Sequence, residues 1–171
     1  MADSRKARGL AQLAPRDRAD RLPNALGFLR LLWAIDHGLR SASRRMHGKL
    51  GITGPQRLVL RIVGKFPDLM PSELAALLHL DRGTLTGILE RLSAQQLLSR
   101  TANEKDGRSF LIRLTARGKL LDREVQGTVE ACIQRALAAL PRAKVEAAKF
   151  VLESVAKELA RDAELAGDSE D

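Results

Sequence analysis

The sequence predicts a mainly helical protein that carries one small β-hairpin. Only 3% of its 171 residues are aromatic, so the core must be built from Leu, Ile, Val and Ala, a composition that favours helices. In several long segments the apolar residues recur at alternating spacings of three and four, which is the pattern of a helix with one apolar face. Residues 110–114 instead alternate with a period of two, which is typical of a strand.

The first elements have recognisable starts and ends. Residues 1–23 are rich in Arg and Asp and are expected to form a mobile basic arm. A long helix then begins at Asn24 and ends at Gly51. Its apolar row consists of Phe28, Leu32, Ile35, Leu39, Ala42 and Met46. Thr53 is expected to cap a second helix, which runs to about Lys65.

The middle of the chain combines short helices with the hairpin. A short helix starts at Pro71, His79 lies in a tight turn, and Asp81 caps a longer helix. Two strands follow, residues 97–102 and 110–115, and they are joined by a charged tip that contains a glycine. We therefore expect a compact unit of helix, helix and hairpin.

Two further helices are expected after the hairpin. Thr115 is predicted to cap a long helix that runs to about Leu140, where Pro141 breaks it. The last helix is followed by residues 166–171, an acidic tail that we expect to be disordered. Cys132 lies on the apolar row of the first of these helices, so we expect a buried, unreactive thiol.

The long helices at the two ends of the chain predict a dimer. Residues 24–50 and 115–165 carry apolar faces that cannot all pack on the small central unit, residues 55–116. Pairing with a second copy would bury these faces, and a symmetric homodimer is the commonest arrangement of that kind.

The charge of the chain favours a polyanionic partner. The net charge is +8 and the isoelectric point is about 10.4, with the positive charge concentrated in residues 1–118 and a net acidic remainder. A basic chain that is merely soluble is the alternative explanation. No apolar run is long enough to span a bilayer, the first ten residues lack the apolar stretch of a signal peptide, and the single cysteine excludes an internal disulfide. We therefore expect a cytoplasmic protein with no membrane partner.

The helix pair that begins at Pro71 meets the requirements of a helix-turn-helix. Such a pair needs a small residue where the helices approach, and Ala75 stands at that position. The shared core needs apolar residues at five spaced positions, which are occupied by Leu74, Leu78, Leu80, Leu85 and Ile88. His79 occupies the turn position that usually holds glycine, and it must therefore adopt a positive φ.

The second helix of this pair has side chains suited to the major groove of DNA. Its predicted contacts are Arg82, Gly83, Thr84, Thr86, Gly87, Glu90 and Arg91. Arginine and threonine recognise base edges or phosphates, and the two glycines allow the backbone to come close. Glu90 is unusual because it repels phosphate; it would accept a hydrogen bond from cytosine N4, or pair with Arg91 or Arg82.

These segments resemble the multiple-antibiotic-resistance regulator (MarR) family over about residues 55–120. The resemblance is carried by ELAALLHLDRGTLTGILERL and NEKDGRSFLIRLTARG, above all by Gly83–Thr86, the Asp106 and Arg108 pair, and the Leu-Thr-x-x-Gly that follows. It implies a winged helix-turn-helix lobe, between long dimerisation helices, that binds a pseudo-palindromic operator in double-stranded DNA. Such proteins are usually repressors that a small ligand or oxidation releases.

The resemblance also implies roles for the hairpin tip and for an effector. Lys105, Asp106 and Arg108 would form the DNA-contacting wing, with Arg108 in the minor groove and Asp106 orienting it. An aromatic acid or phenol would bind between the dimerisation helices and the DNA-binding lobe. The candidate lining residues are Trp33, His37, Arg40, Arg57, Arg61 and Ile62. Plain interface packing is the alternative for Trp33 and His37.

Other classes of function find less support. The sequence has no Ser–His–Asp arrangement, no phosphate loop after a strand and no metal-ligand spacing, so we expect neither an enzyme nor a bound metal or cofactor. The branch of the family that senses peroxide carries a cysteine near the start of the first helix, and this chain does not. A winged helix that binds proteins, or an architectural DNA-binding module without ligand sensing, remains the alternative.

Overall fold

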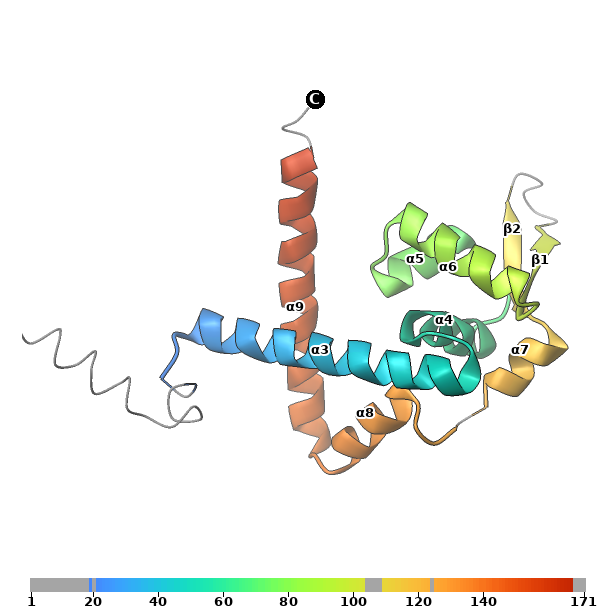
Figure 1. The fold of residues 1–171 in the computed structure, drawn as a ribbon. Helices are drawn as coiled ribbons and strands as arrows, with labels where there is room; N and C mark the ends of the chain where they lie inside the picture. The colour runs from blue at the N-terminus through green and yellow to red at the C-terminus, as the bar shows by residue number, and fades with distance from the viewer. Residues whose placement is uncertain (1–18, 20, 104–108, 124, 168–171) are drawn as a thin grey trace, which may run out of the picture. The chain divides into compact units, whose positions relative to one another are not determined.

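The computed structural model describes residues 19, 21–103, 109–123 and 125–167, and it divides into two compact units, residues 1–123 and 124–171 (Figure 1). The first unit contains α3 (Asn24–Leu50), α4 (Gly54–Lys65), α5 (Pro71–Leu78), α6 (Arg82–Ala94), β1 (Leu98–Ala102), β2 (Phe110–Leu114) and α7 (Ala116–Leu121). The second contains α8 (Val129–Ala138) and α9 (Arg142–Gly167). The predicted fold class, mainly helical with a two-stranded wing, is confirmed.

The ends of α3 and α4 follow the predicted capping residues. Gly51 ends α3 in the left-handed conformation with φ 71°, and its N–H donates to the carbonyl of His47. Thr53 caps α4 in a reciprocal box, in which its side chain accepts from the N–H of Gln56 and the Gln56 side chain accepts from the N–H of Thr53. The caps therefore fix where each helix stops and starts.

The tight turn between α5 and α6 is the predicted one. His79 takes φ 50°, so a non-glycine residue does occupy the left-handed position. The N–H of Leu80 returns to the carbonyl of Ala75, the small residue expected at the closest approach of the two helices. Asp81 then caps α6.

The wing is an antiparallel hairpin with one further pairing. β1 and β2 pair in a register that joins Leu98 to Leu114, and Leu69 adds an isolated bridge to Ile112 on the other edge of β2. Ile112 also belongs to the hydrophobic core, which α4, α5, α6 and the wing share. The core members that are fully or nearly fully buried are Ile52, Val59, Leu60, Val63, Leu74, Leu85, Ile88, Leu89, Leu92, Leu97, Leu98 and Ile112. The hairpin is thus attached to the helix pair through side chains and backbone alike.

The prediction of one helix from Thr115 to about Leu140 is wrong. Thr115 does cap a helix, but α7 ends at Leu121, and α8 begins eight residues later, at Val129, after its own cap, Thr128. Between them Gly127 adopts φ 81°, which the interior of a right-handed helix cannot contain. The apolar spacing continued across this break and gave no sign of it.

Arg57 explains why α7 stops where it does. Its side chain is only 1% exposed, and its guanidinium donates to the carbonyls of Leu121 and Arg123. Arg61, one turn further along α4, donates to the carbonyl and the carboxylate of Asp122. These carbonyls would serve a continuing helix, but here the two arginines use them to hold the end of α7 against α4.

Replacing Gly118 with alanine should destabilise the fold. A Cβ at this buried position of α7 would collide with the carbonyl oxygen of Leu97, which accepts from the N–H of Thr115. Because the obstacle is backbone, overpacking should lower the free energy of unfolding by about 1–3 kcal/mol. Thermal denaturation measures the loss, and Gly48→Ala is the control because a Cβ there meets nothing within 4 Å. Equal melting temperatures for the two variants would contradict this packing.

Cys132 does not occupy the buried position that we expected. It is exposed on α8, and the Arg135 side chain donates to its sulfur at 3.3 Å. The apolar row of α8 is present, but only Val129 on it is half-buried, and its side chains from Cys132 onward are exposed.

Candidate nucleic-acid interface

The exposed side of α6 brings most of the predicted DNA contacts together. Leu85, Ile88, Leu89 and Leu92 turn inward to the core. The remaining side of the helix presents Arg82, Gly83, Thr84, Thr86, Glu90 and Arg91, all exposed, with Gly87 half-buried. Almost three turns of helix therefore display basic, hydroxyl and acidic groups beside two positions that have no side chain.

The N-terminus of α6 is held by Asp81. One carboxylate oxygen accepts from the N–H of Thr84 at 2.8 Å, and the other accepts from the Thr84 hydroxyl at 2.6 Å. The Thr84 hydroxyl and N–H lower the pKa of Asp81 below its ordinary value. The cap is therefore formed by the ionised carboxylate, and its contribution to stability is present at neutral pH and lost as the pH falls through this lowered pKa.

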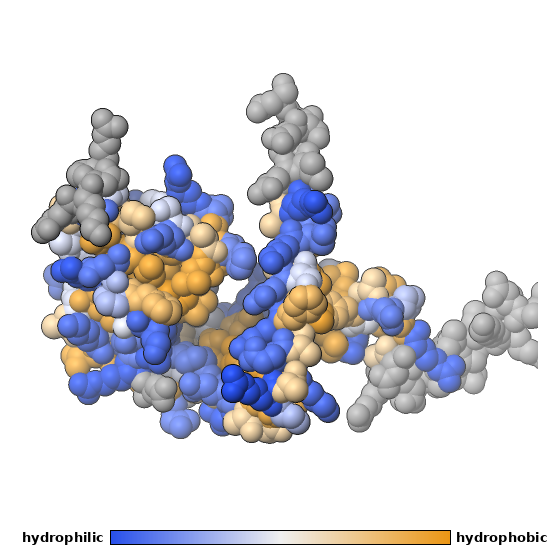
Figure 2. All heavy atoms as spheres, turned by 180° about the vertical axis from the view of Figure 1, so that it is seen from behind, coloured by the Kyte–Doolittle hydropathy of each residue, from blue (hydrophilic) through white to orange (hydrophobic). Residues whose placement is uncertain are grey.

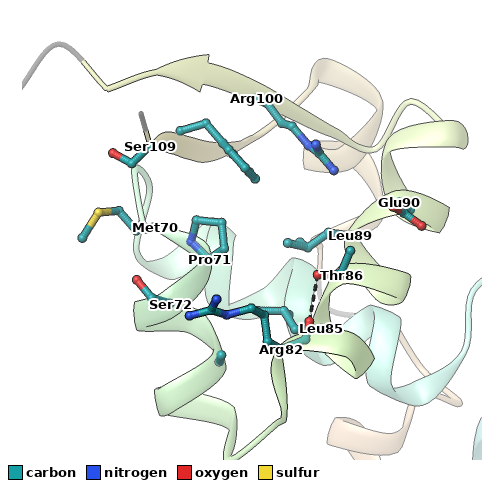
Figure 3. A pocket seen from close by; sticks show the side chains of 12 residues that line it. Met70, Pro71, Ser72, Arg82, Leu85, Thr86, Leu89, Glu90, Arg100 and Ser109 are labelled. Carbon is teal, nitrogen blue, oxygen red and sulfur yellow. Dashed lines mark hydrogen bonds between the residues drawn. The ribbon is translucent and has the colours of Figure 1, made fainter. Parts of the chain in front are cut away.

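The hydroxyl of Thr86 is also used within the helix. It donates to the carbonyl of Arg82 at 2.8 Å, shown as the dashed line in Figure 3. With its hydrogen engaged in this way, Thr86 presents to an outside partner its methyl group and the two lone pairs of its oxygen. That chemistry fits the 5-methyl group of thymine better than it fits a base acceptor.

The wing is described only up to the base of its tip. Asn103 and Ser109 close the hairpin, because the Asn103 side chain donates to the Ser109 hydroxyl at 2.9 Å and its N–H to the Ser109 carbonyl at 3.2 Å. The predicted contacts Lys105, Asp106 and Arg108 lie outside the described residues, so their role stays a prediction.

A pocket that the sequence did not predict lies between α5, α6 and the wing. Its volume is about 630 Å³, and it is lined in part by Pro71, Leu85 and Phe110 and by the polar side chains of Arg82, Thr86 and Arg100. Figure 3 shows Arg82 extending from α6 toward α5 and Arg100 extending from β1 toward α6. Arg100 stacks over the ring of Phe110 at 4.7 Å, a cation–π contact that holds its side chain in place.

None of the six residues proposed for the effector lines this pocket. Trp33 is 70% exposed on α3, His37 is exposed, and Arg40 pairs with Asp36 one turn away. Ile62 is half-buried against the core. Arg57 and Arg61 hold the end of α7, a structural role that the sequence reading missed. Their part in ligand binding stays a prediction.

The described part of the chain lacks the features of two other kinds of site. It contains no group of three or more His, Cys, Asp or Glu side chains placed to hold a metal ion. None of its helices combines the length and the apolar character required to cross a membrane.

Comparison with known proteins places these features in one family. Residues 50–109 match the sequence model described as the MarR family. The organic hydroperoxide resistance transcriptional regulator of Bacillus subtilis is 37% identical over 64% of this chain and 75% of its own length. A helix-turn-helix transcriptional repressor of Mycobacterium tuberculosis is 30% identical over 76% of this chain and 92% of its own length.

Solved structures agree with the sequence matches. A mutant MarR of E. coli, crystallised in complex with operator DNA, superposes with a TM-score of 0.61 and is 26% identical. The superposition covers 74% of this chain and 91% of that one. The helix-turn-helix, the wing and a match that covers 92% of the length of the M. tuberculosis repressor agree, and this chain belongs to the MarR family.

Proposed function

We propose that this protein is a homodimeric transcriptional regulator that binds double-stranded DNA, most simply as a repressor of nearby genes. The observation that carries the proposal is the exposed side of α6, on which Arg82, Thr84, Thr86 and Arg91 surround two glycines at a capped helix N-terminus. A recognition helix of this composition can enter the major groove. The MarR of E. coli that this chain resembles was crystallised with operator DNA, which supports the same use of the fold.

Exposed apolar side chains on the long helices support the homodimer. On α3, Trp33 is 70% and Ile35 is 54% exposed, and on α9, Leu152 is 44% and Leu159 is 64% exposed. Figure 2 shows apolar side chains at the surface of both helices. Surfaces of this kind are rare on a monomer, and a second copy of the chain would cover them.

Gel retardation with DNA from the gene's own upstream region tests the proposal. A dimer should retard fragments that contain an inverted repeat whose half-sites lie about 10 bp apart, one turn of the double helix. Absence of retardation for every DNA at low salt would end the regulator proposal and would favour a winged helix that binds proteins. Binding without any sequence preference would favour an architectural role.

Thr86 should contribute through its methyl group. We expect Thr86→Val, which keeps a methyl and removes the hydroxyl, to retain the preference for a thymine in each half-site. Thr86→Ser, which removes the methyl, should lose about 0.8 kcal/mol, or roughly fourfold in affinity. Binding assays on operators with thymine or uracil at that position provide the measurement, since uracil lacks only the methyl. Equal losses for Ser on both operators would show that the methyl is not read.

Release by a small ligand is the finer part of the proposal. The pocket beside α6 combines apolar walls with the two cations Arg82 and Arg100 and the one carboxylate of Glu90, a net positive lining that suits a small aromatic acid or a phenolate. Because Arg82 and Thr86 belong both to this pocket and to the exposed side of α6, a bound ligand would compete with DNA for the same side chains. The B. subtilis relative is named for organic hydroperoxide resistance, but the single cysteine of this chain lies on α8, so we do not extend peroxide sensing to it.

Two variants distinguish the pocket from the site first expected between the helices. A panel of aromatic acids and phenols is screened by thermal shift of the DNA-free protein. Arg100→Gln should weaken binding of any acid found by about tenfold, because a charge-assisted hydrogen bond is lost. Arg40→Gln, which removes an exposed arginine from α3, should leave it unchanged. The opposite pattern would favour the site between the helices, and no shift with any compound would favour regulation without a ligand of this class.

A further inference from the structure

Glu90 has no ion-pair partner within the described part of the chain, although the winged lobe around it is basic. It lies on the exposed side of α6, seven residues after Gly83 and three after Gly87, on the face opposite the buried Leu89 row. Arg82 and Arg100 line the same pocket but do not pair with it (Figure 3). Its carboxylate is therefore available to a partner outside the chain.

Gly87 indicates how close that partner comes. A Cβ at this position would meet nothing within 4 Å, and its φ is not positive, so the fold itself does not require glycine. Glycine in a helix costs about 1 kcal/mol relative to alanine. The missing side chain is explained if a molecule outside the chain approaches the backbone beside Glu90.

A carboxylate at a DNA interface is unfavourable near phosphates and favourable near a hydrogen-bond donor. In the major groove the donors are the amino groups of cytosine N4 and adenine N6. Adenine presents the acceptor N7 directly beside N6, and this lone pair repels a carboxylate, whereas cytosine presents no acceptor of its own beside N4. Cytosine is therefore the base that an ionised Glu suits.

We propose that Glu90 is a specificity-determining residue that reads one cytosine in each half-site by accepting a hydrogen bond from N4. The absent side chains of Gly83 and Gly87 let α6 sit low enough in the groove for the shorter reach of a glutamate. This inference rests on the proposed binding of DNA by α6, and it adds a base and a chemical group to it.

The test is selection of binding sites from random duplex DNA with the full-length wild type, Glu90→Gln and Glu90→Ala. The wild type should select a fixed C·G pair at one position of each half-site. Glu90→Ala should lose the preference at that position alone, by about tenfold. Glu90→Gln should shift the preference there toward adenine, because a glutamine amide pairs with adenine N6 and N7. The affinity of both variants for sites with other bases there should rise, because a negative charge has been removed. Glu153→Gln removes the same charge from an exposed position on α9 and should leave the selected sequence unchanged.

The outcomes distinguish failure of the Glu90 proposal from failure of the proposed DNA binding. A uniform rise in affinity for all sequences, with the selected positions unchanged, would mean that Glu90 faces phosphates and would overturn the proposal. If the C·G preference weakens only in Glu90→Ala and Glu90→Gln shows no shift toward adenine, the side chain does not contact the base edge, and this result would also overturn the proposal. If the wild type retards no DNA at low salt, the regulator proposal fails together with this one. If it binds a defined operator that lacks the cytosine preference, only this one fails.

Discussion

Replacing Arg57 with methionine should lower the free energy of unfolding by about 2–4 kcal/mol, because the carbonyls of Leu121 and Arg123 lose a buried, charged donor. Methionine fills a comparable volume, so the loss reports on hydrogen bonding more than on packing. Arg57 is 1% exposed, and its bonds to the carbonyls of Leu121 and Arg123 join α4 to the end of α7 across more than sixty residues of sequence. Thermal or denaturant unfolding at a fixed protein concentration measures the effect, at roughly 2–4 °C per kcal/mol.

Arg61→Met is the matched control. Arg61 occupies the same face of α4 one turn later, but its side chain is 30% exposed and its ion pair with Asp122 is open to solvent. Screening by water limits such a pair to less than about 1 kcal/mol, so this variant should be the milder of the two. If Arg57→Met and Arg61→Met lose the same stability, the buried guanidinium is not what holds α7.

Arg57 and Arg61 show which structural features can be predicted from a sequence and which cannot. Thr53, Asp81, Thr115 and Gly51 were predicted as helix boundaries because a cap depends on residues within one turn of the helix end. The positive φ of His79 followed from its place in the turn. Arg57 was interpreted as a ligand contact. Its actual partners, the carbonyls of Leu121 and Arg123, lie at and just beyond the end of α7, and the spacing of residues along the chain carries no information about such distant contacts.

The break between α7 and α8 was missed for the same reason. The apolar row predicted from Val125 to Leu140 is a local signal, and it is compatible with one helix or two. What ends α7 is the use of its last carbonyls by a side chain from α4, together with the left-handed Gly127. Of these signals only the glycine could be seen in the sequence, and a single glycine is also tolerated inside helices.

In the candidate site, too, some positions could be predicted from local sequence and others could not. The exposed residues of α6 could be placed together from helical periodicity alone, because the buried residues Leu85, Ile88 and Leu92 fix which side faces out. The position of Arg100 could not be predicted, since its place in the same pocket as Arg82 depends on how the wing packs beside α6. Arg100 pairs with Ile112 across the hairpin, and Phe110 lies two residues before Ile112 on the same face. The cation–π contact between Arg100 and Phe110 could therefore have been predicted once the strand register was known.

Replacing Leu152 with glutamate should convert the protein to a monomer and weaken operator binding by about 100-fold or more. Leu152 lies on the predicted apolar row of α9 and is 44% exposed in the single chain. In a dimer that buries this row, the substitution places an unpaired carboxylate in an apolar interface, which is strongly unfavourable. The winged lobe should keep its fold, because Leu152 is not a member of its core. Light scattering reports the mass, and gel retardation reports the affinity.

Ser154→Glu separates loss of the dimer from a mere change of charge. Ser154 is exposed two residues further along α9, which places it on the opposite side of the helix from Leu152. The same charge there should leave both the mass and the affinity close to those of the wild type. Loss of DNA binding in a Leu152→Glu protein that is still a dimer would mean that α9 acts on the winged lobe by another route. A wild type that is already monomeric at micromolar concentration would remove the homodimer from the proposed function, because two recognition helices could not then be held one turn of DNA apart.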